Sequence, residues 1–372
     1  MVHSPSRLAA GGAGWAVSRG LAAAASVALL TLSVPGSVGV AAAAPAAAMP
    51  SRYVQTNLVS DQPGMAQLTD PWLVNAWGLS AGPTSPLWVS DNGTDVSTLY
   101  TGAAAGGTIT AIPLVVAIPG GAPTGQVFNP TAGFVLPDGS PAFFLFTSEN
   151  GVLSGWNPAA GTSAVQVGAV GHAVYKGLAL ELVGGTERLL AANFHSGRID
   201  MFTSTFHRVH VGAHQFVDPS LPSGYAPFNV AVVGGQVLVT YAKQDPTRHD
   251  DVAGDGHGFV DAFTLNGKLL GSIARKGPLN SPWGLAVAPA GFGQFAGDLL
   301  VGNFGDGRIH AYDLSTWRLM GTLKATDGSP LAIDGLWGLL PGNGVNADTD
   351  AVWFSAGPGG EAHGLLGTLA SS

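Results

Sequence analysis

The chain contains no cysteine among its 372 residues, and only 10% of its residues are charged. Disulfides, thiolate metal sites and cysteine nucleophiles are therefore excluded. The Gly-x-Ser-x-Gly elbow of α/β-hydrolases does not occur either. Acidic residues outnumber basic ones, 23 to 15, and there is no basic cluster, which argues against a nucleic-acid partner or an anionic membrane surface.

Glycine and proline are abundant, with 55 and 25 residues, while long helical patterns are scarce. Many short apolar runs separated by Gly-rich and Pro-rich turns are typical of an all-β protein. Hydrophobic residues make up 46% of the chain. This argues against disorder, because low hydrophobicity is what keeps chains unfolded.

Residues 1–48 differ from the rest of the chain. Arg7 and Arg19 are their only Lys or Arg residues, an apolar stretch follows, and Ala-rich sequence comes last. This order predicts a signal peptide over residues 1–48, and hence a secreted, extracellular protein whose single domain spans 49–372. The alternative is an N-terminal membrane anchor. The shortness of the apolar stretch favours cleavage, and beyond this segment we expect no membrane attachment.

A short motif built around Trp-Gly-Leu recurs six times, roughly every 50 residues. The copies lie at 75–79, 131–134, 176–179, 227–230, 281–285 and 336–339. After each copy come two apolar runs around a turn, as in 298–313, and a further run follows most of these hairpins. Apolar runs flanking Gly-rich turns predict β-hairpins, so each unit is expected to supply up to four strands.

Six units of four short strands predict a six-bladed β-propeller, with a β-sandwich or a stack of sheets as the alternative. The sixth unit ends after three strands, whereas residues 53–58 form a strand-like run that belongs to no unit. We expect this N-terminal run to complete the last blade and close the ring, which removes an exposed sheet edge.

The repeated units resemble those of the NHL and quinoprotein-like group of six-bladed propellers. The runs 57–61, 75–79 and 249–254 are more closely similar to an uncharacterised family of secreted bacterial propellers, some of which carry a PEP-CTERM sorting tail. The resemblance implies a six-bladed propeller and secretion, and it implies no activity.

Antiparallel strands place the entry to each first strand and the turn between the second and third strands on one face of the ring. Asn and Asp at the entries offer the oxygen ligands that calcium prefers. The candidate calcium ligands are Asn75, Asn129, Asn229 and Asp334. In similar six-bladed lactonases, Asn, Asp and Glu at the channel mouth hold calcium; the alternative is that these side chains cap turns. Further candidates at the channel mouth are Lys176, Asn193 and Asn303, and Glu149 lies in a turn of the same face.

The largest insertion, residues 243–258, falls between the second and third strands of the fourth unit, on this same face. Long loops in compact domains are often functional. The candidate ligand-contacting residues of the loop are His249, Asp250, Asp251, Asp255 and His257. The alternative is an ordered flap with solvated charges, and the spacing does not match a helix–loop–helix calcium site.

These features favour a secreted binding or scaffold protein that uses the face with the 243–258 loop, since no catalytic constellation is recognisable. The alternative is a calcium-dependent hydrolase of the lactonase type with a metal at the channel mouth; a lyase or quinone-cofactor enzyme is a weaker third reading.

No cofactor other than calcium is indicated. The expected partner is a small molecule, a glycan or a secreted protein, and the expected state is a monomer. His207, His210 and His214 form a local cluster that suits a strand and its following loop.

Overall fold

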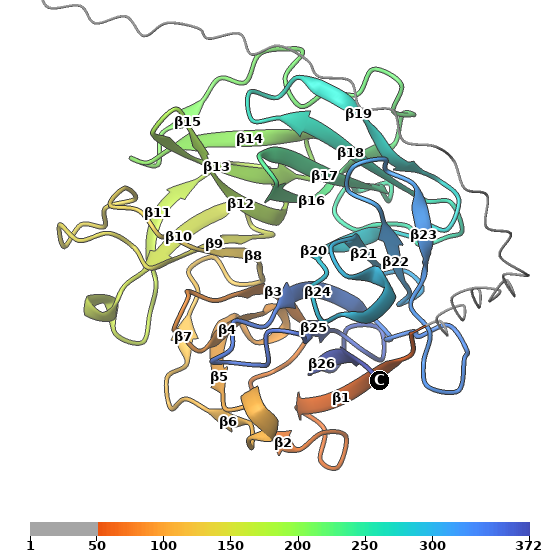
Figure 1. Cartoon of the computed structure of the whole chain (residues 1–372). Helices are drawn as coiled ribbons and strands as arrows, with labels where there is room; N and C mark the ends of the chain where they lie inside the picture. The colour runs from red at the N-terminus through yellow and green to blue at the C-terminus, as the bar shows by residue number, and fades with distance from the viewer. Residues whose placement is uncertain (1–50) are drawn as a thin grey trace, which may run out of the picture. The chain divides into compact units, whose positions relative to one another are not determined.

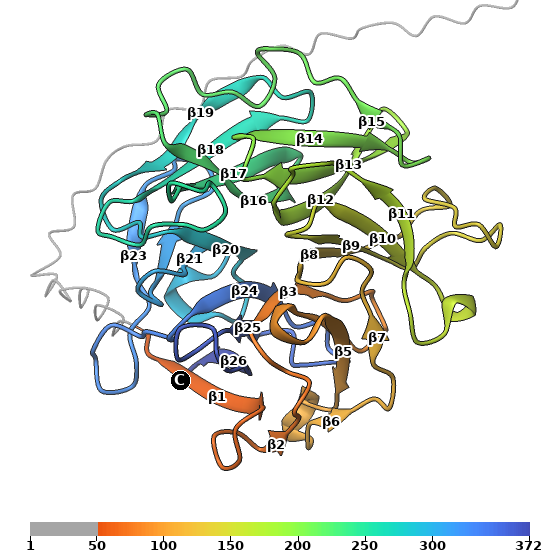
Figure 2. The same cartoon turned by 180° about the vertical axis from the view of Figure 1, so that it is seen from behind.

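The computed structural model describes residues 51–372 as six β-sheets arranged in a ring. Figure 1 shows the ring face-on, and Figure 2 shows it from behind. The six-bladed β-propeller expected from the repeats is confirmed. The predicted signal peptide, residues 1–48, lies outside the described residues. Within residues 51–372, no helix has the length and apolarity needed to cross a bilayer.

The strands of blades one to three follow one another outwards from the ring axis in chain order (Figure 1). Blade one holds β3 (Ala76–Ser80), β4 (Leu87–Asp91), β5 (Val96–Thr101), β6 (Thr110–Ala111) and β7 (Val116–Ala117), the last two both pairing with β5. Blade two holds β8 (Pro123–Phe128), β9 (Phe144–Ser148), β10 (Val152–Trp156) and β11 (Val165–Ala169). Blade three holds β12 (Tyr175–Val183), β13 (Thr186–Asn193), β14 (Arg198–Thr203) and β15 (Arg208–Val209).

Blades four to six continue the same order. Blade four holds β16 (Tyr225–Val233), β17 (Gln236–Lys243), β18 (Gly258–Thr264) and β19 (Leu269–Arg275). Blade five holds β20 (Pro282–Val287), β21 (Leu299–Asn303), β22 (Ile309–Tyr312) and β23 (Leu319–Thr322). Blade six holds β24 (Leu336–Pro341), β25 (Val352–Ala356) and β26 (Leu365–Ser371). Short 3-10 helices lie at Asn92–Thr94, Ala104–Gly106, Pro158–Ala160 and Gly293–Phe295.

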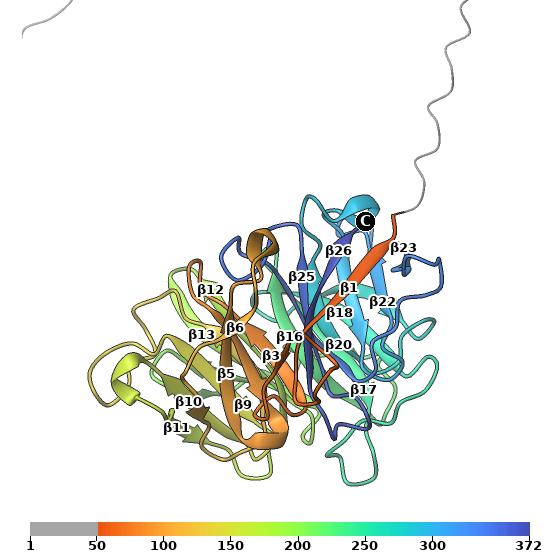
Figure 3. The ribbon, with the colours of Figure 1, turned by 90° about the horizontal axis from the view of Figure 1, so that it is seen from below.

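An N-terminal strand completes blade six, as the sequence predicts. β1 (Tyr53–Ser60) runs antiparallel to β26, and Tyr53 lies opposite Ser371 in the register. Figure 3 shows the two strands side by side. The Tyr53 hydroxyl donates to the carbonyl of Phe292 over 3.1 Å, and β2 (Leu68–Thr69) adds a short parallel pairing to β1. The ring is therefore closed between the two ends of the described chain, and β26 presents no free edge.

The second and third strands of the blades are buried along most of their length. Every residue of β4, β9, β10, β21 and β25 is buried. Each blade packs against a neighbour on both of its faces, so its strands resemble those of a sheet covered on both sides. This explains why these strands appear in the sequence as apolar runs and alternate only imperfectly.

Glycines stand where the innermost strands approach one another most closely. A Cβ atom on Gly125 would lie 2.3 Å from the backbone nitrogen of Leu178 in the next blade. One on Gly78 would lie 2.3 Å from the carbonyl oxygen of Thr124. The glycine of the repeated motif is therefore required by the close passage of another backbone.

The innermost strand of blade two lies elsewhere than the motif predicts. The Gly-Phe run at 131–134 is a loop, and the strand is β8, which carries Gly125. Blade two lacks the tryptophan of the motif. The loop sequence Thr-Ala-Gly-Phe at 131–134 therefore matches the motif better than Thr-Gly-Gln at 124–126, which is the actual strand sequence. The prediction of this one strand was wrong, and it also misplaced Asn129, which follows β8 instead of preceding it.

Candidate functional site

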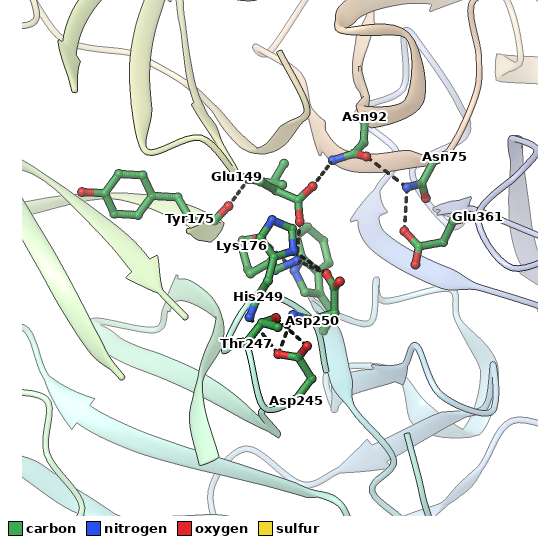
Figure 4. Close-up of polar contacts among 12 residues, drawn as sticks. Asn75, Asn92, Glu149, Tyr175, Lys176, Asp245, Thr247, His249, Asp250 and Glu361 are labelled. Atoms are coloured by element: carbon green, nitrogen blue, oxygen red, sulfur yellow. Dashed lines mark hydrogen bonds and ion pairs between the residues drawn. The ribbon is translucent and has the colours of Figure 1, made fainter. Parts of the chain in front are cut away.

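One face of the ring gathers polar side chains over the axis. The register pairs Ala76, at the start of β3, with Asp91, at the end of β4. The entry to an innermost strand and the turn after the second strand therefore share a face, as the sequence predicts. We call the group formed there by Asn75, Asn92, Glu149, Lys176, His249, Asp250 and Glu361 the axial cluster (Figure 4).

Lys176 is the centre of the axial cluster. It is the second residue of β12, and its side chain is only 2% exposed. Its ammonium pairs with the Glu149 carboxylate from the turn after β9, and with Asp250 Oδ1, from the 243–258 loop, over 3.2 Å. Burial lowers the pKa of Lys176, but the two carboxylates raise it more, so its pKa is raised overall. The side chain is therefore a permanent buried cation shared by three blades.

A chain of amides and carboxylates extends from this ion pair. Asn92 Nδ2 donates to Glu149 Oε2 over 3.0 Å, and Asn75 Nδ2 donates to Asn92 Oδ1 over 3.1 Å. Asn75 Nδ2 also donates to Glu361 Oε2 over 2.7 Å. Burial raises the pKa of Glu361, although the hydrogen bond from Asn75 opposes this effect. Five of the six blades thus contribute a side chain to one connected polar network.

The 243–258 loop is held in place by its own hydrogen bonds. The Asp245 carboxylate accepts from the backbone N–H of His249 over 2.9 Å and from the Thr247 hydroxyl over 2.6 Å. Gln244 Nε2 donates to the carbonyl of Phe194 over 2.6 Å, which ties the loop to blade three. The loop therefore presents Asp250 to Lys176 in a defined position, while 66% of the Asp250 side chain stays exposed.

Three side chains of the axial cluster have the geometry of metal ligands. Ligand atoms of Glu149, His249 and Asp250 all lie within 4.8 Å of one another, and His249 Nδ1 is 2.8 Å from Asp250 Oδ1. A divalent cation prefers such carboxylate oxygens. The Lys176 ammonium, however, already contacts both carboxylates and supplies the positive charge that a metal would bring.

An aromatic plug closes the axis beneath the axial cluster. We define it as Trp77, Phe194, Phe228, Trp283, Phe304 and Trp337. The Lys176 ammonium lies 5.1 Å from the Trp77 ring centroid, and the Trp283 indole donates to the Lys176 carbonyl over 2.9 Å. The repeated tryptophans therefore pack around the axis, consistent with a structural role. At the far ends of the innermost strands lies a cavity of about 590 Å³, lined by Leu79, Val127, Leu178, Val230, Leu285 and Leu339 among others.

The four predicted calcium ligands do not form one site. Asn75 joins the axial cluster, but Asn129 lies at the other end of its strand, where it donates to the carbonyl of Ala142 over 2.8 Å. Asn229 stands within β16, and its amide donates to the carbonyl of Trp283 over 2.8 Å. Asp334 accepts from the backbone N–H of Gly359 over 2.9 Å. The amides of Asn129 and Asn229 are therefore used in holding the fold.

The remaining predicted residues divide between the cluster and the scaffold. Lys176, His249 and Asp250 join the axial cluster. Asn193 donates to Asp200 inside blade three, and Asn303 donates to Asp306 in blade five. In the loop, Asp251 has an unpaired buried oxygen and a pKa raised by burial, Asp255 is exposed, and His257 contacts the Val252 carbonyl through Nδ1.

The sequence places Glu149 on this face, but Glu149 is not among the predicted site residues, and neither are Asn92 and Glu361. All three lie between the second and third strands of their blades: Asn92 after β4, Glu149 after β9 and Glu361 after β25. Their common position in the repeat therefore indicates that these residues lie on this face. Applying the same rule to every blade would have found these residues.

The fold and the axial cluster define a six-bladed β-propeller with a polar site at one mouth of the ring. No protein-family model matches the chain. Two relatives from Acanthamoeba polyphaga mimivirus, uncharacterized protein R648 and uncharacterized protein L690, are each 33% identical to it. The aligned regions cover 84% of this chain in both cases, and 78% and 84% of the relatives. The chain therefore belongs to the family of these uncharacterised proteins.

Solved structures with the same fold include two lyases. Virginiamycin B lyase from Staphylococcus aureus matches with a TM-score of 0.51 and 14% identity, over 86% of this chain and 99% of the lyase. A streptogramin B lyase matches with a TM-score of 0.50 and 11% identity, over 87% and 98%. Likeness at this identity shows the fold alone. The relatives found by sequence are viral, so the comparisons do not support the expected bacterial family.

Proposed function

We propose that the protein is a binding protein whose ligand lies on the axial cluster, against the 243–258 loop. One observation carries the proposal: a buried lysine, two carboxylates and an amide network converge from five blades on the ring axis. Burying a charge costs free energy unless the charge is paired. A scaffold alone does not need such a buried charged cluster, so the cluster favours a role in binding. The half-exposed Asp250 and His249 offer a ligand direct access to the cluster.

The chemistry of the cluster suits a small hydroxylated molecule or the end of a glycan. Carboxylates accept hydrogen bonds, amides both donate and accept, and the ammonium donates. Glu149, Asp250 and Glu361 outnumber the single Lys176, so an anionic ligand is disfavoured. Neutral hydroxyl groups can pair with every member of the cluster without adding charge to it.

Thermal unfolding of the full chain with a panel of neutral monosaccharides, oligosaccharides and polyols tests this function. A ligand that binds the folded state raises the Tm. We expect at least one compound to raise the Tm of the wild type and to lose this effect in D250N. The control is D255N, which makes the same charge change at an exposed position of the same loop. A shift that persists in D250N would place the ligand elsewhere and contradict the proposal.

A calcium-dependent hydrolase is the second candidate, because Glu149, His249 and Asp250 lie within 4.8 Å of one another. A cation held there would polarise a lactone or ester carbonyl, and a neighbouring carboxylate would act as general base. The Lys176 ammonium disfavours this reading, since it competes with a cation for the same oxygens. Hydrolysis of lactones or esters that depends on calcium and stops with EDTA would support it.

We also propose that the protein acts outside the cell, because residues 1–48 have the layout of a signal peptide. The test is the N-terminal sequence of the protein recovered from an expressing culture. A mature N-terminus near residue 49 in the medium supports the proposal. A full-length chain retained in the cells contradicts it.

A further inference from the structure

We propose a second binding site, for a tetrahedral oxyanion such as a phosphate or sulfate group, on the outer strands of blade three. A cavity of about 380 Å³ lies there, away from the axial cluster, where β14 and β15 run along the outside of the ring (Figure 1). Its lining residues are Arg198, Ile199, Asp200, Arg208, Val209, His210 and Val211. The cavity thus collects two arginines and a histidine in a chain whose net charge is −8.

A single buried carboxylate fixes both arginines. Asp200 is 2% exposed, and its Oδ1 accepts from Arg198 Nε over 3.0 Å and from Arg208 Nη2 over 2.5 Å. Its Oδ2 accepts from Asn193 Nδ2 over 2.7 Å and from the Tyr175 hydroxyl over 3.0 Å. Both oxygens of Asp200 are therefore occupied, and the two guanidinium groups are held side by side.

The two arginines keep charge and donors that the fold does not use. Two guanidinium charges face one carboxylate, so the group carries a net charge of +1. Each guanidinium has five N–H donors. Within residues 51–372, the Arg198 side chain is hydrogen-bonded only through Nε and the Arg208 side chain only through Nη2. The other donors, and the exposed His210 imidazole, remain available to a ligand in the cavity.

The sheet opens at the same place. β14 and β15 pair only at Met201 with Val209 and at Phe202 with Arg208. Beyond this point the ladder between β14 and β15 does not continue, and Ile199, Asp200, His210 and Val211 all line the cavity. The fixed guanidinium groups thus border a space large enough for an oxyanion, and the planar fork of arginine matches the oxygens of phosphate and sulfate.

A neighbouring pair provides a matched comparison. In blade four, Arg275 is bound to Asp218 over 2.7 Å, and its exposure equals that of Arg208. Arg275 also donates to the Ser220 carbonyl over 2.9 Å and lies 5.0 Å from the Phe259 ring centroid. The charge of Arg275 is balanced by one carboxylate, and its guanidinium already contacts protein groups. We therefore expect Arg275 to bind no anion.

The test is calorimetric titration of the full chain with inorganic phosphate and with sulfate, at an ionic strength held constant with chloride. We expect saturable binding by the wild type, at least about tenfold weaker in R198Q, because a charge-assisted pair is lost. Arg198 is 54% exposed, so R198Q should fold normally, and R275Q should bind like the wild type. No saturable binding by the wild type, or equal losses in R198Q and R275Q, would overturn the proposal. Binding of phosphate but not sulfate would support it and identify a phosphorylated ligand.

Discussion

Trp77 and Trp337 stack across the junction of the first and last blades, with their ring centroids 3.5 Å apart and their planes inclined by 21°. Phe304 stacks on the other side of Trp337, with the centroids 3.9 Å apart. The Trp337 indole also donates to Asn75 Oδ1 over 3.0 Å, which links the plug to the axial cluster. The stack therefore joins the closure of the ring to the site above it.

Removing the central ring of this stack should destabilise the protein strongly. We expect W337A to lower the free energy of unfolding by about 3–5 kcal/mol, because it leaves a large cavity and an unpaired Asn75 oxygen. W337F should lose less. Chemical denaturation measures both, and W72A is the control, since Trp72 is 47% exposed. An equal effect of W337A and W72A would show that the plug does not stabilise the ring.

The glycine of the motif should not tolerate a side chain. We expect G125A to lower the free energy of unfolding by about 1–3 kcal/mol, because its Cβ would meet the backbone of Leu178 at 2.3 Å. G168A is the matched control: its Cβ would have its nearest neighbour, Leu153 Cβ, at 3.8 Å. Denaturant unfolding of the two variants gives the comparison, and an unaffected G125A would refute the close-packing argument.

The repeats predicted the fold well, because blade packing imposes the same glycine and the same apolar runs in most blades. They also predicted the face that carries the site, since antiparallel pairing fixes which turns lie together. They could not predict which polar side chains meet. That outcome depends on the path of the 243–258 loop, which brings Asp250 to Lys176. It also depends on Asn229, which looked like a ligand but stands in the glycine position of β16 and bridges to Trp283.

Closure by β1 should be essential for stability. We expect a chain that starts at residue 61 to unfold at a lower temperature than one that starts at residue 49, and to aggregate more readily. The reason is that loss of β1 exposes the edge of β26 and removes Tyr53 from its contacts with Phe292 and Phe295. Calorimetry and light scattering of the two chains test this, and equal unfolding temperatures would contradict it.

The pH dependence of stability should include a contribution from Glu181. This carboxyl is fully buried and its oxygens have no hydrogen-bond partner, although the Arg188 guanidinium lies 3.7 Å from Oε1. Burial raises the pKa of Glu181 from 4.5 to about 7, and the Arg188 charge opposes this effect only in part. Between these values the folded state binds more protons than the unfolded state, so stability from this group falls as pH rises. We expect E181Q to remove this fall and to be more stable than the wild type above pH 7, by about 3 kcal/mol.

The comparison requires unfolding curves of both proteins from pH 5 to pH 8. Asp261, whose pKa burial raises to about 6, titrates in the same range, so only the difference between the two proteins isolates Glu181. E187Q, on the paired strand β13, is the control. A wild type and an E181Q whose stabilities change in parallel with pH would disprove the assignment.

We expect Lys176 to act as the cation of the axial cluster. A binding protein would keep this lysine between the carboxylates, whereas a calcium-dependent hydrolase would need a metal there. K176M leaves Glu149 and Asp250 facing each other without their counter-ion, which should lower stability by about 3–5 kcal/mol. The same variant should gain affinity for calcium, because Glu149, His249 and Asp250 then surround an unfilled position.

The most direct test is therefore the Tm of the wild type and of K176M, each measured with EDTA and then with added calcium. We expect no change in the Tm of the wild type and a rise of several degrees for K176M. A wild type that calcium stabilises by several degrees, and that EDTA destabilises, would contradict the role of Lys176 as the cation of the axial cluster. The axial cluster would then be a metal site, and the hydrolase would become the leading function.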